Sequence, residues 1–221
     1  SGINMCGIAG IFNYDGKPAS HAELKKMTDA IAHRGPDGEG FYVNGKIGLG
    51  HRRLSILDLT EGGKQPMSFA DGRYWITYNG EIYNFLEIKS SLEKTGYSFC
   101  SNSDTEVILA AYHQWKENCL TRFNGMWAFA IWDNKEESLF IARDRFGVKP
   151  LFYYATSSRL GFASEIKALL ASGEFKPEIN EPKLCEFLKG GSLSSTNETL
   201  FKNIFLIPPG TWFKTDSSGN R

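Results

Sequence analysis

The sequence lacks an apolar run long enough to cross a bilayer. The longest, residues 126–132, falls far short of the roughly 20 residues that a membrane helix needs. It also lacks a recognisable secretory leader, an internal repeat and a low-complexity tract. Net charge is missing as well, since 25 Lys plus Arg balance 25 Asp plus Glu. We therefore expect no membrane partner and no nucleic-acid partner.

Paired cysteines are absent too. The chain has neither a Cys-x-x-Cys pair nor a metal-ligand spacing among its four cysteines, Cys6, Cys100, Cys119 and Cys185. This pattern is typical of free thiols in a reducing compartment rather than of a disulfide framework. It predicts a cytoplasmic protein.

What the chain does contain is enough apolar surface for a sizeable core. Its 221 residues are 41% hydrophobic and 14% aromatic, which suits one large domain or one domain plus a fragment. Apolar patterning predicts strands over residues 8–14, 74–79, 126–133, 138–144, 151–155 and 160–164. Many strands joined by short turns, with a few amphipathic helices, indicate an α+β domain with antiparallel sheet. Periodicity alone leaves the stacking of the sheets open.

Turn and capping signals divide these elements. Asn44-Gly45 between apolar runs predicts a type I′ hairpin. Gly80 is expected to end the strand before it. Capping boxes are predicted where a serine precedes a glutamate by three residues, at Ser20 with Glu23 and at Ser103 with Glu106.

The most informative residue is Cys6, which directly follows Met5. A lone cysteine near a chain end is more often a small buried hydrophobe than a functional group. Residues 1–4 resemble an expression leader, however, and we expect Met5 to be the initiator. After its removal the Cys6 thiol would sit beside a free α-amine, whose ordinary pKa is about 7.7–8.0. One residue would then hold both a nucleophile and a base to activate it.

Seven segments match one family in order and spacing. They are Met5-Cys6-Gly7-Ile8-Ala9-Gly10, His33-Arg34-Gly35-Pro36-Asp37, His51-Arg52-Arg53-Leu54-Ser55-Ile56, Asn79-Gly80-Glu81-Ile82-Tyr83-Asn84, Ser103-Asp104-Thr105-Glu106, residues 143–150 and residues 164–169. Together they resemble the glutaminase domain of glutamine-dependent asparagine synthetases, within the class II glutamine amidotransferases. The resemblance covers nearly the whole chain from Met5. It implies a four-layer αββα N-terminal-nucleophile hydrolase sandwich of two antiparallel sheets.

The resemblance implies hydrolysis of the side-chain amide of glutamine to glutamate and ammonia. Cys6 would attack the amide carbon and form a thioester, while its α-amine manages the protons. Asn79 and Gly80 match the family's oxyanion hole, whose donors each contribute about 10²–10³ in rate. Asn-Gly is also an ordinary turn dipeptide, and the two interpretations are compatible.

The resemblance also implies a clamp for a free amino acid. Arg53 matches the residue that grips the α-carboxylate, and the backbone through Leu54, Ser55, Ile56 and Leu57 would line the pocket. Arg52 should face the opposite way, because side chains alternate along a strand. Asp104 and Glu81 match the α-ammonium contacts. For Asp104 the alternative is a helix cap, which the box at Ser103 and Glu106 makes unnecessary. Glu81 could instead orient the loop that carries Arg53.

Two further segments receive weaker assignments. Residues 34–37 are expected to brace the site. Residues 143–150 resemble the family's path toward a second active site, although a basic turn between strands fits these residues equally well. His33, His51 and His113 lie at no paired ligand spacing, and the family chemistry needs no metal, so no metal site is predicted.

A partner domain is implied but not found. Family members carry an ATP-using synthetase domain that opens with a Ser-Gly-Gly-x-Asp-Ser loop, and Gly190-Gly191-Ser192 lacks that pattern. We therefore interpret residues 1–5 as leader plus initiator and residues 6–221 as an amidotransferase domain without its C-terminal synthetase domain. This domain would need no cofactor, and ATP and Mg would belong to the missing one. Its partners would be L-glutamine and that synthetase domain, and a homodimer is compatible with the pattern. The ammonia acceptor is aspartate or another carboxylate.

Two interpretations from other classes stay open. One is a non-catalytic domain that supports dimerisation or docking of the synthetase. The other is an N-terminal-nucleophile hydrolase acting on a different amide, such as a peptide or an acylated amine. Arg53 and Asp104 favour a free amino acid, because their charges suit its two ends.

Overall fold

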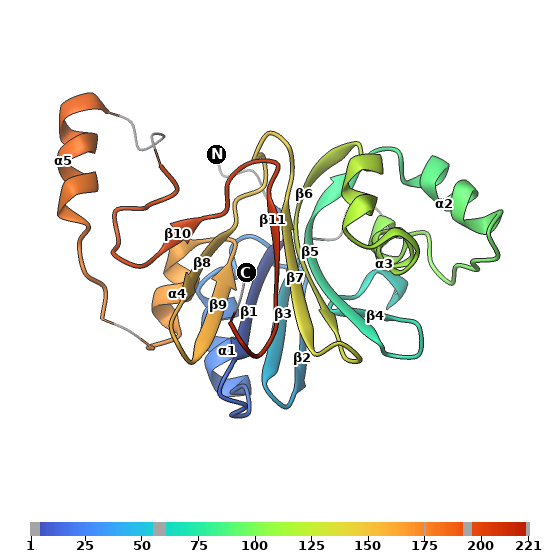
Figure 1. Ribbon diagram of the computed structural model, residues 1–221, viewed down its shortest axis with the longest axis horizontal. Helices are drawn as coiled ribbons and strands as arrows, with labels where there is room; N and C mark the ends of the chain where they lie inside the picture. The colour runs from blue at the N-terminus through green and yellow to red at the C-terminus, as the bar shows by residue number, and fades with distance from the viewer. Residues whose placement is uncertain (1–4, 55–60, 175, 192–195, 220–221) are drawn as a thin grey trace.

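The computed structural model describes residues 5–54, 61–174, 176–191 and 196–219, and two antiparallel sheets form its centre (Figure 1). Sheet A has the order β10-β8-β9-β1-β3-β2. Its strands are β1 (Gly7–Asn13), β2 (Gly38–Asn44), β3 (Ile47–Arg53), β8 (Phe152–Ala155), β9 (Arg159–Ala163) and β10 (Phe205–Leu206). The strand nearest the N-terminus therefore lies inside its sheet, between β9 and β3.

Sheet B has the order β11-β7-β6-β5-β4. Its strands are β4 (Met67–Phe69), β5 (Tyr74–Ile82), β6 (Gly125–Asp133), β7 (Ser138–Arg143) and β11 (Trp212–Thr215). The long pair β5 and β6 runs in register from Tyr74 opposite Asp133 to Ile82 opposite Gly125. A continuous hydrogen-bonded ladder thus holds the residues around Asn79.

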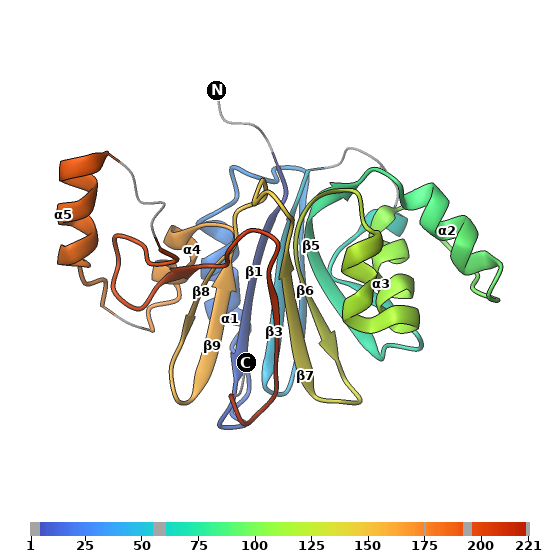
Figure 2. The same ribbon diagram turned by 45° about the horizontal axis from the view of Figure 1, so that its top comes forward.

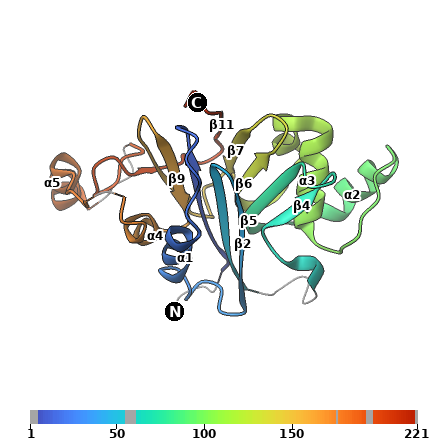
Figure 3. The same cartoon turned by 90° about the horizontal axis from the view of Figure 1, so that it is seen from below.

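Helices cover the outer face of each sheet (Figures 2 and 3). The helices α1 (His21–Asp29) and α4 (Ile166–Ala171) pack on sheet A, while α2 (Phe85–Glu93) and α3 (Asp104–Trp115) pack on sheet B. Two short 3-10 helices span Glu61–Gly63 and Lys116–Arg122. The helix α5 (Glu181–Gly190) stands away from both sheets (Figure 1). The layers are α, β, β and α, as the family resemblance implies.

Three apolar clusters hold these layers together. One lies between the sheets and includes Ile8 and Phe12 of β1 with Ala128 and Ala130 of β6. The other two lie between each sheet and its helices. Since even-numbered β1 residues belong to the inter-sheet cluster and Ala9 and Ile11 to the helix side, Cys6 shares the inward parity of Ile8.

Polar contacts also join the two sheets. The Thr77 hydroxyl on β5 donates to the Gly50 carbonyl on β3 at 2.9 Å, and His51 Nε2 lies 3.1 Å from the Tyr78 carbonyl oxygen. His51 is fully buried, and burial lowers its pKa to about 4. Its ring is therefore neutral near pH 7 and donates from Nε2 to the carbonyl.

The predicted strands and helices are present, with two corrections. In the β2–β3 hairpin Asn44 pairs with Ile47, so the turn residues are Gly45 and Lys46 rather than Asn44 and Gly45. Only Gly45 has a positive φ, of 52°, so the turn is not type I′. Strand β5 continues through Gly80 to Ile82 instead of stopping there, because the ladder to β6 satisfies its backbone.

All four cysteines are free thiols. Across the described parts of the chain, we find no helix of the length and hydropathy that a membrane span requires.

Candidate active site

Strand register brings Cys6 and Asn79 toward each other from opposite sheets. Cys6 immediately precedes the Gly7–Arg52 pair of β1 and β3. On β5, Thr77 contacts β3, so Asn79 two residues later faces the same sheet. Gly50 and His51 of β3 contact Thr77 and Tyr78 of β5. The residues that follow them on each strand therefore lie near one another, at the end of the sandwich where β1 begins. The sequence-predicted nucleophile and oxyanion donor therefore share one end of the inter-sheet space.

The Cys6 thiol is half-buried against the chain that follows β3. The Leu54 N–H donates to Cys6 Sγ at 3.3 Å, and Sγ lies 3.5 Å from the Leu54 carbonyl oxygen. Burial raises the pKa of the thiol, while the Leu54 N–H and the charges of Lys149, Arg53 and Arg34 lower it. Burial is the largest of these effects, so the thiol needs a base to become a thiolate at neutral pH.

Arg34 holds the backbone of Cys6 in place. Its Nε donates to the Cys6 carbonyl at 3.0 Å, and its Nη1 pairs with Glu165 at 2.9 Å. The next residue, Gly35, lies so close to β3 that a Cβ there would come within 2.3 Å of the Arg52 carbonyl carbon. The Asp37 N–H donates to the Arg53 carbonyl. These contacts support the predicted bracing role of residues 34–37.

Asn79 carries a buried amide nitrogen that has no hydrogen-bond partner in the described structure. Leaving such a donor unsatisfied costs about 1–3 kcal/mol. A ligand that supplied an acceptor atom would remove this cost. The neighbouring Gly80 admits no side chain, since a Cβ would lie 2.3 Å from the Met126 carbonyl oxygen. Glycine at position 80 is required by close strand packing, which explains why it does not end the strand.

The two adjacent arginines face opposite ways, as strand alternation predicts. Arg52 points to α1, where Nε donates to the Thr28 carbonyl at 3.1 Å and the guanidinium pairs with Asp29 and with Glu39. Arg53 has the inward parity of His51, and its charge acts on both His51 and Cys6. Only Arg53 is therefore placed to meet a ligand at Cys6.

Asp104 is buried, and its carboxylate is already engaged. Its Oδ2 accepts from the Tyr78 hydroxyl at 2.8 Å and from the Ile82 N–H at 2.9 Å. Burial raises its pKa, and the Glu81 carboxylate also raises it. The carboxylate is thus not free, contrary to the reasoning from the capping box, although a carboxylate offers about four acceptor sites and two contacts leave capacity for an ammonium.

The capping boxes form only in part. Ser103 accepts from the Thr105 N–H and caps α3, but Glu106 accepts from the backbone of Cys100 and Ser101 instead of closing the box. Likewise Ser20 accepts from the Glu23 N–H, while the Glu23 carboxylate pairs with Arg159.

Three predicted pocket residues, Ser55, Ile56 and Leu57, lie outside the described residues. Leu54, the first residue of that segment, contacts Cys6 as described above. Glu81 on β5 is half-buried beside Asp104, and its charge also acts on Lys149.

Sequence reasoning missed Lys149 in the loop between β7 and β8. Its side chain is buried, and its Nζ lies 2.9 Å from the sulfur of Met5, two residues before β1. A lysine within a motif of turn residues gave a weak signal, because lysines are usually solvated.

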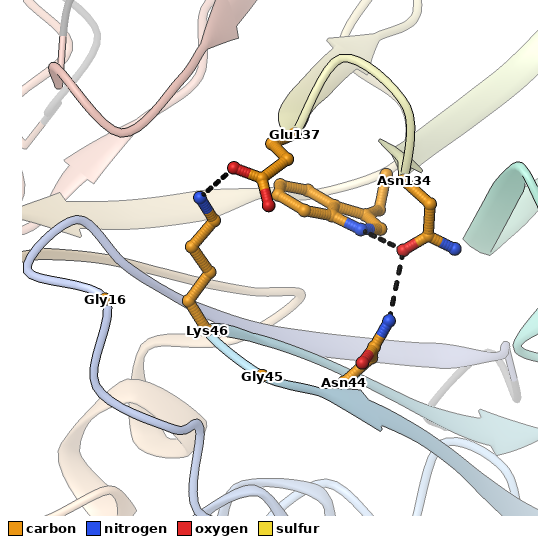
Figure 4. A pocket seen from close by; sticks show the side chains of 7 residues that line it. Gly16, Asn44, Gly45, Lys46, Asn134 and Glu137 are labelled. Carbon is orange, nitrogen blue, oxygen red and sulfur yellow. Dashed lines mark hydrogen bonds and ion pairs between the residues drawn. The ribbon is translucent and has the colours of Figure 1, made fainter.

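A separate pocket of about 470 Å³ opens at the other end of the sandwich (Figure 4). It lies between Gly16 after β1, the β2–β3 turn and the β6–β7 turn. Its polar groups bind one another: Lys46 pairs with Glu137 at 2.6 Å, and Asn134 Oδ1 accepts from Asn44 and Trp132. Its lining thus offers few groups to a ligand. Within the described ranges, no three His, Cys, Asp or Glu side chains gather in a way that could hold a metal ion.

Comparison with solved structures supports the fold. Glutamine phosphoribosylpyrophosphate amidotransferase from Bacillus subtilis superimposes with a TM-score of 0.65 at 23% identity. The match covers 79% of this chain and 45% of that one. At this identity the likeness concerns the fold alone, and it confirms the four-layer sandwich that the family resemblance implied.

Sequence relatives are closer. Asparagine synthetase [glutamine-hydrolyzing] 1 of Bacillus subtilis (strain 168) is 40% identical over 98% of this chain. A putative asparagine synthetase [glutamine-hydrolyzing] 2 of Methanocaldococcus jannaschii is 43% identical over 92%. The chain spans only 34% and 42% of the length of these two proteins. Residues 5–221 match the family defined as the glutamine amidotransferase domain. With the fold, the placement of Cys6 and this match in agreement, the chain belongs to the glutamine amidotransferase domain family.

Proposed function

We propose that this chain hydrolyses L-glutamine to glutamate and ammonia through a thioester on Cys6. The thiol sulfur would attack the side-chain amide carbon, and the carbon–nitrogen bond would break. The α-amine of Cys6 would take the thiol proton and deliver it to the leaving ammonia. Water would then cleave the thioester, giving the glutamate carboxylate and restoring the thiol.

The observation that carries this proposal is the buried, unpartnered Nδ2 of Asn79, which faces the sheet that begins with Cys6. A tetrahedral oxyanion formed at the sulfur would supply the missing acceptor. An interaction that forms only as the oxyanion develops lowers the barrier rather than the ground state.

The charges around the site suit a free amino acid. Arg53 provides a cation beside Cys6 for an α-carboxylate. Asp104 and Glu81 provide anions for an α-ammonium on the β5 side. This pairing favours free glutamine over an amide within a peptide chain or an acylated amine, in which no single carbon carries both a free α-carboxylate and a free α-ammonium.

The longer relatives are named as asparagine synthetases, and their names support a proposal for the fate of the ammonia. We infer that a synthetase domain outside this chain consumes the ammonia with ATP and Mg, and that aspartate or another carboxylate is the acceptor. Four free thiols, one of them the nucleophile, would be preserved in a reducing cytoplasm.

The test uses protein that begins at Cys6, with Cys6→Ala as its matched control. Glutamate release by the first protein and none by the second supports the proposal, as does a mass shift of one glutamyl group on Cys6 after a rapid quench. Turnover by Cys6→Ala equal to wild type would refute it. Hydrolysis of acylated amines but not of glutamine would establish the alternative amide hydrolase.

A further inference from the structure

Lys149, in the loop between β7 and β8, is a buried lysine that glutamine hydrolysis, as described above, does not use. Burial lowers its pKa, and nearby anions raise it. Its side chain is 5% exposed, and its Nζ contacts the Met5 sulfur at 2.9 Å. In the described structure no carboxylate oxygen lies within ion-pair distance of it. A thioether is a weak acceptor, and unpaired buried lysines are rare because burial of a lone charge is costly.

The loop that carries Lys149 is built to hold it in place. Asp144 accepts hydrogen bonds from four backbone N–H groups, those of Trp127, Phe146, Val148 and Lys149, at 2.9–3.3 Å. Arg143 donates from Nε to the Lys149 carbonyl at 2.8 Å and also binds the carbonyls of Ile207 and Gly147. Arg143 and Asp144 therefore fix the backbone on both sides of Lys149.

Three cations from different elements act on the charge of Cys6. Lys149 comes from the β7–β8 loop, Arg34 from the α1–β2 turn and Arg53 from the end of β3. Tyr78 on β5 also interacts with the Cys6 charge, and burial keeps its phenol neutral. The acidic groups lie one step further away, where Glu165 pairs with Arg34, and Glu81 and Asp144 act on Lys149. Cations thus dominate the immediate surroundings of the thiol.

We propose that Lys149 is a positioning residue that places a positive charge beside the N-terminal amine and thiol of the processed chain, and so keeps Cys6 in its reactive form at neutral pH. This inference rests on the proposed function, because it concerns the amine that appears when Met5 is removed. Met5, which Lys149 contacts, is the residue bonded to the Cys6 nitrogen.

The physical reason is repulsion between like charges. An α-ammonium beside Lys149 is destabilised, so the amine loses its proton at a lower pH, and a thiolate there is stabilised. The thiol and the amine titrate as a coupled pair, and losing the first proton yields the reactive state whichever group carries the remaining one. Removing the Lys149 charge should therefore move the acid limb of activity to higher pH.

The experiment compares kcat/KM for glutamine from pH 5.5 to 9 in wild type, Lys149→Met and Lys149→Arg, all beginning at Cys6. For Lys149→Met we expect the acid limb to shift upward by about 0.5–1 pH unit, the effect of one charge in a partly hydrated site. Lys149→Arg keeps the charge, so its acid limb should stay at the wild-type position. Lys167→Met serves as the matched control. That lysine is half-exposed and pairs with Glu165 at 3.1 Å, so the same loss of charge should move the limb little.

A second measurement separates this inference from the proposed function. The pH dependence of Cys6 alkylation by iodoacetamide, without glutamine, should show the same upward shift in Lys149→Met. If the pH profile of Cys6 alkylation shifts in Lys149→Met as expected but wild type does not hydrolyse glutamine, the proposed function fails and the role of Lys149 stands. If Lys149→Met lowers kcat/KM at every pH while both acid limbs stay in place, Lys149 is only structural and the inference is wrong. Should Lys149→Met fail to fold, Lys149→Gln is judged by the same two criteria, and failure of both variants to fold would likewise make the lysine structural.

Discussion

At the scale of single residues, Asn79 carries a buried hydrogen-bond donor that a ligand could satisfy. Its buried Nδ2 has no acceptor in the described structure, and a developing oxyanion would provide one. We expect Asn79→Ala to lower kcat by about 10²–10³ with little change in KM, because the contact strengthens only in the transition state. Steady-state kinetics on protein beginning at Cys6 measures this. A raised KM with unchanged kcat would reassign Asn79 to ground-state binding.

Arg53 and Arg52 form a natural matched pair, adjacent in sequence but on opposite faces of β3. Losing Arg53 would leave the α-carboxylate of glutamine without its cation, so Arg53→Ala should raise KM by 10²-fold or more, corresponding to about 3 kcal/mol. Arg52→Ala removes only contacts with α1 and Glu39 and should change KM little. The reverse result would mean that the pocket lies on the other face of the strand.

Asp104 should make glutamine binding depend on pH. An α-ammonium binds the ionised carboxylate, and burial raises the pKa of Asp104 above its ordinary value. The affinity is therefore full above this raised pKa and falls as the pH drops through it, at a higher pH than for an exposed aspartate. Calorimetric titration of glutamine into Cys6→Ala protein measures the dependence. Adding Asp104→Asn should weaken binding and remove this dependence. Unchanged affinity in that double variant would exclude Asp104 from the clamp.

Single residues were predicted unevenly from sequence, for physical reasons. Side chains alternate along a strand, so the adjacent positions of Arg52 and Arg53 were enough to predict that they face opposite ways. The partners of Asp104 could not, because Tyr78 and Ile82 reach it only through the packing of α3 on sheet B. Lys149 was missed since burial of a loop lysine depends on the fold around it.

At the scale of elements, β3 and β5 are joined across the sandwich by His51. Its neutral ring bonds the Tyr78 carbonyl, and burial lowers its pKa to about 4 from an ordinary value of 6.5. Between these values the unfolded chain takes up a proton and the folded chain does not, so the free energy of unfolding falls as the pH falls. From pH 7 to 5 this single residue should remove about 2 kcal/mol.

Chemical denaturation at several pH values tests the element-scale prediction. His51→Gln should be less stable than wild type at pH 7 but should lose less stability on acidification. His21→Gln is the control, because His21 lies on the surface of α1. If wild type and His51→Gln showed the same pH slope, His51 would not be the group that titrates.

Elements themselves were predicted well where one local rule decides them, and less well at their ends. The apolar pattern of each of these segments was enough to predict that it forms a strand. The β2–β3 turn lies one residue later than predicted, because Asn44 already pairs with Ile47 and only Gly45 and Lys46 remain for the turn. Glycine at position 80 permits close strand packing as well as a turn, and only the neighbouring strand β6 distinguishes these uses.

At the scale of the molecule, the stacking of the two sheets could not be derived from periodicity. It came from family resemblance, and the fold confirms it. That stacking is what creates the site, because Cys6 and Asn79 belong to different sheets and meet only when these pack face to face. The two residues are 73 positions apart in the sequence, so the sequence does not show that they are close. The cross-sheet contacts of Thr77 and His51 bring their strands together.

The central claim is that Cys6 acts with its own α-amine, and residues 1–5 block that amine. The most direct measurement compares glutamate release by homogeneous, mass-verified protein that retains residues 1–5 with release by protein that begins at Cys6. An acylated nitrogen cannot serve as a base, so the longer protein should be slower by roughly 10²–10⁴-fold, the usual contribution of a general base. Equal turnover in the two proteins would contradict the account.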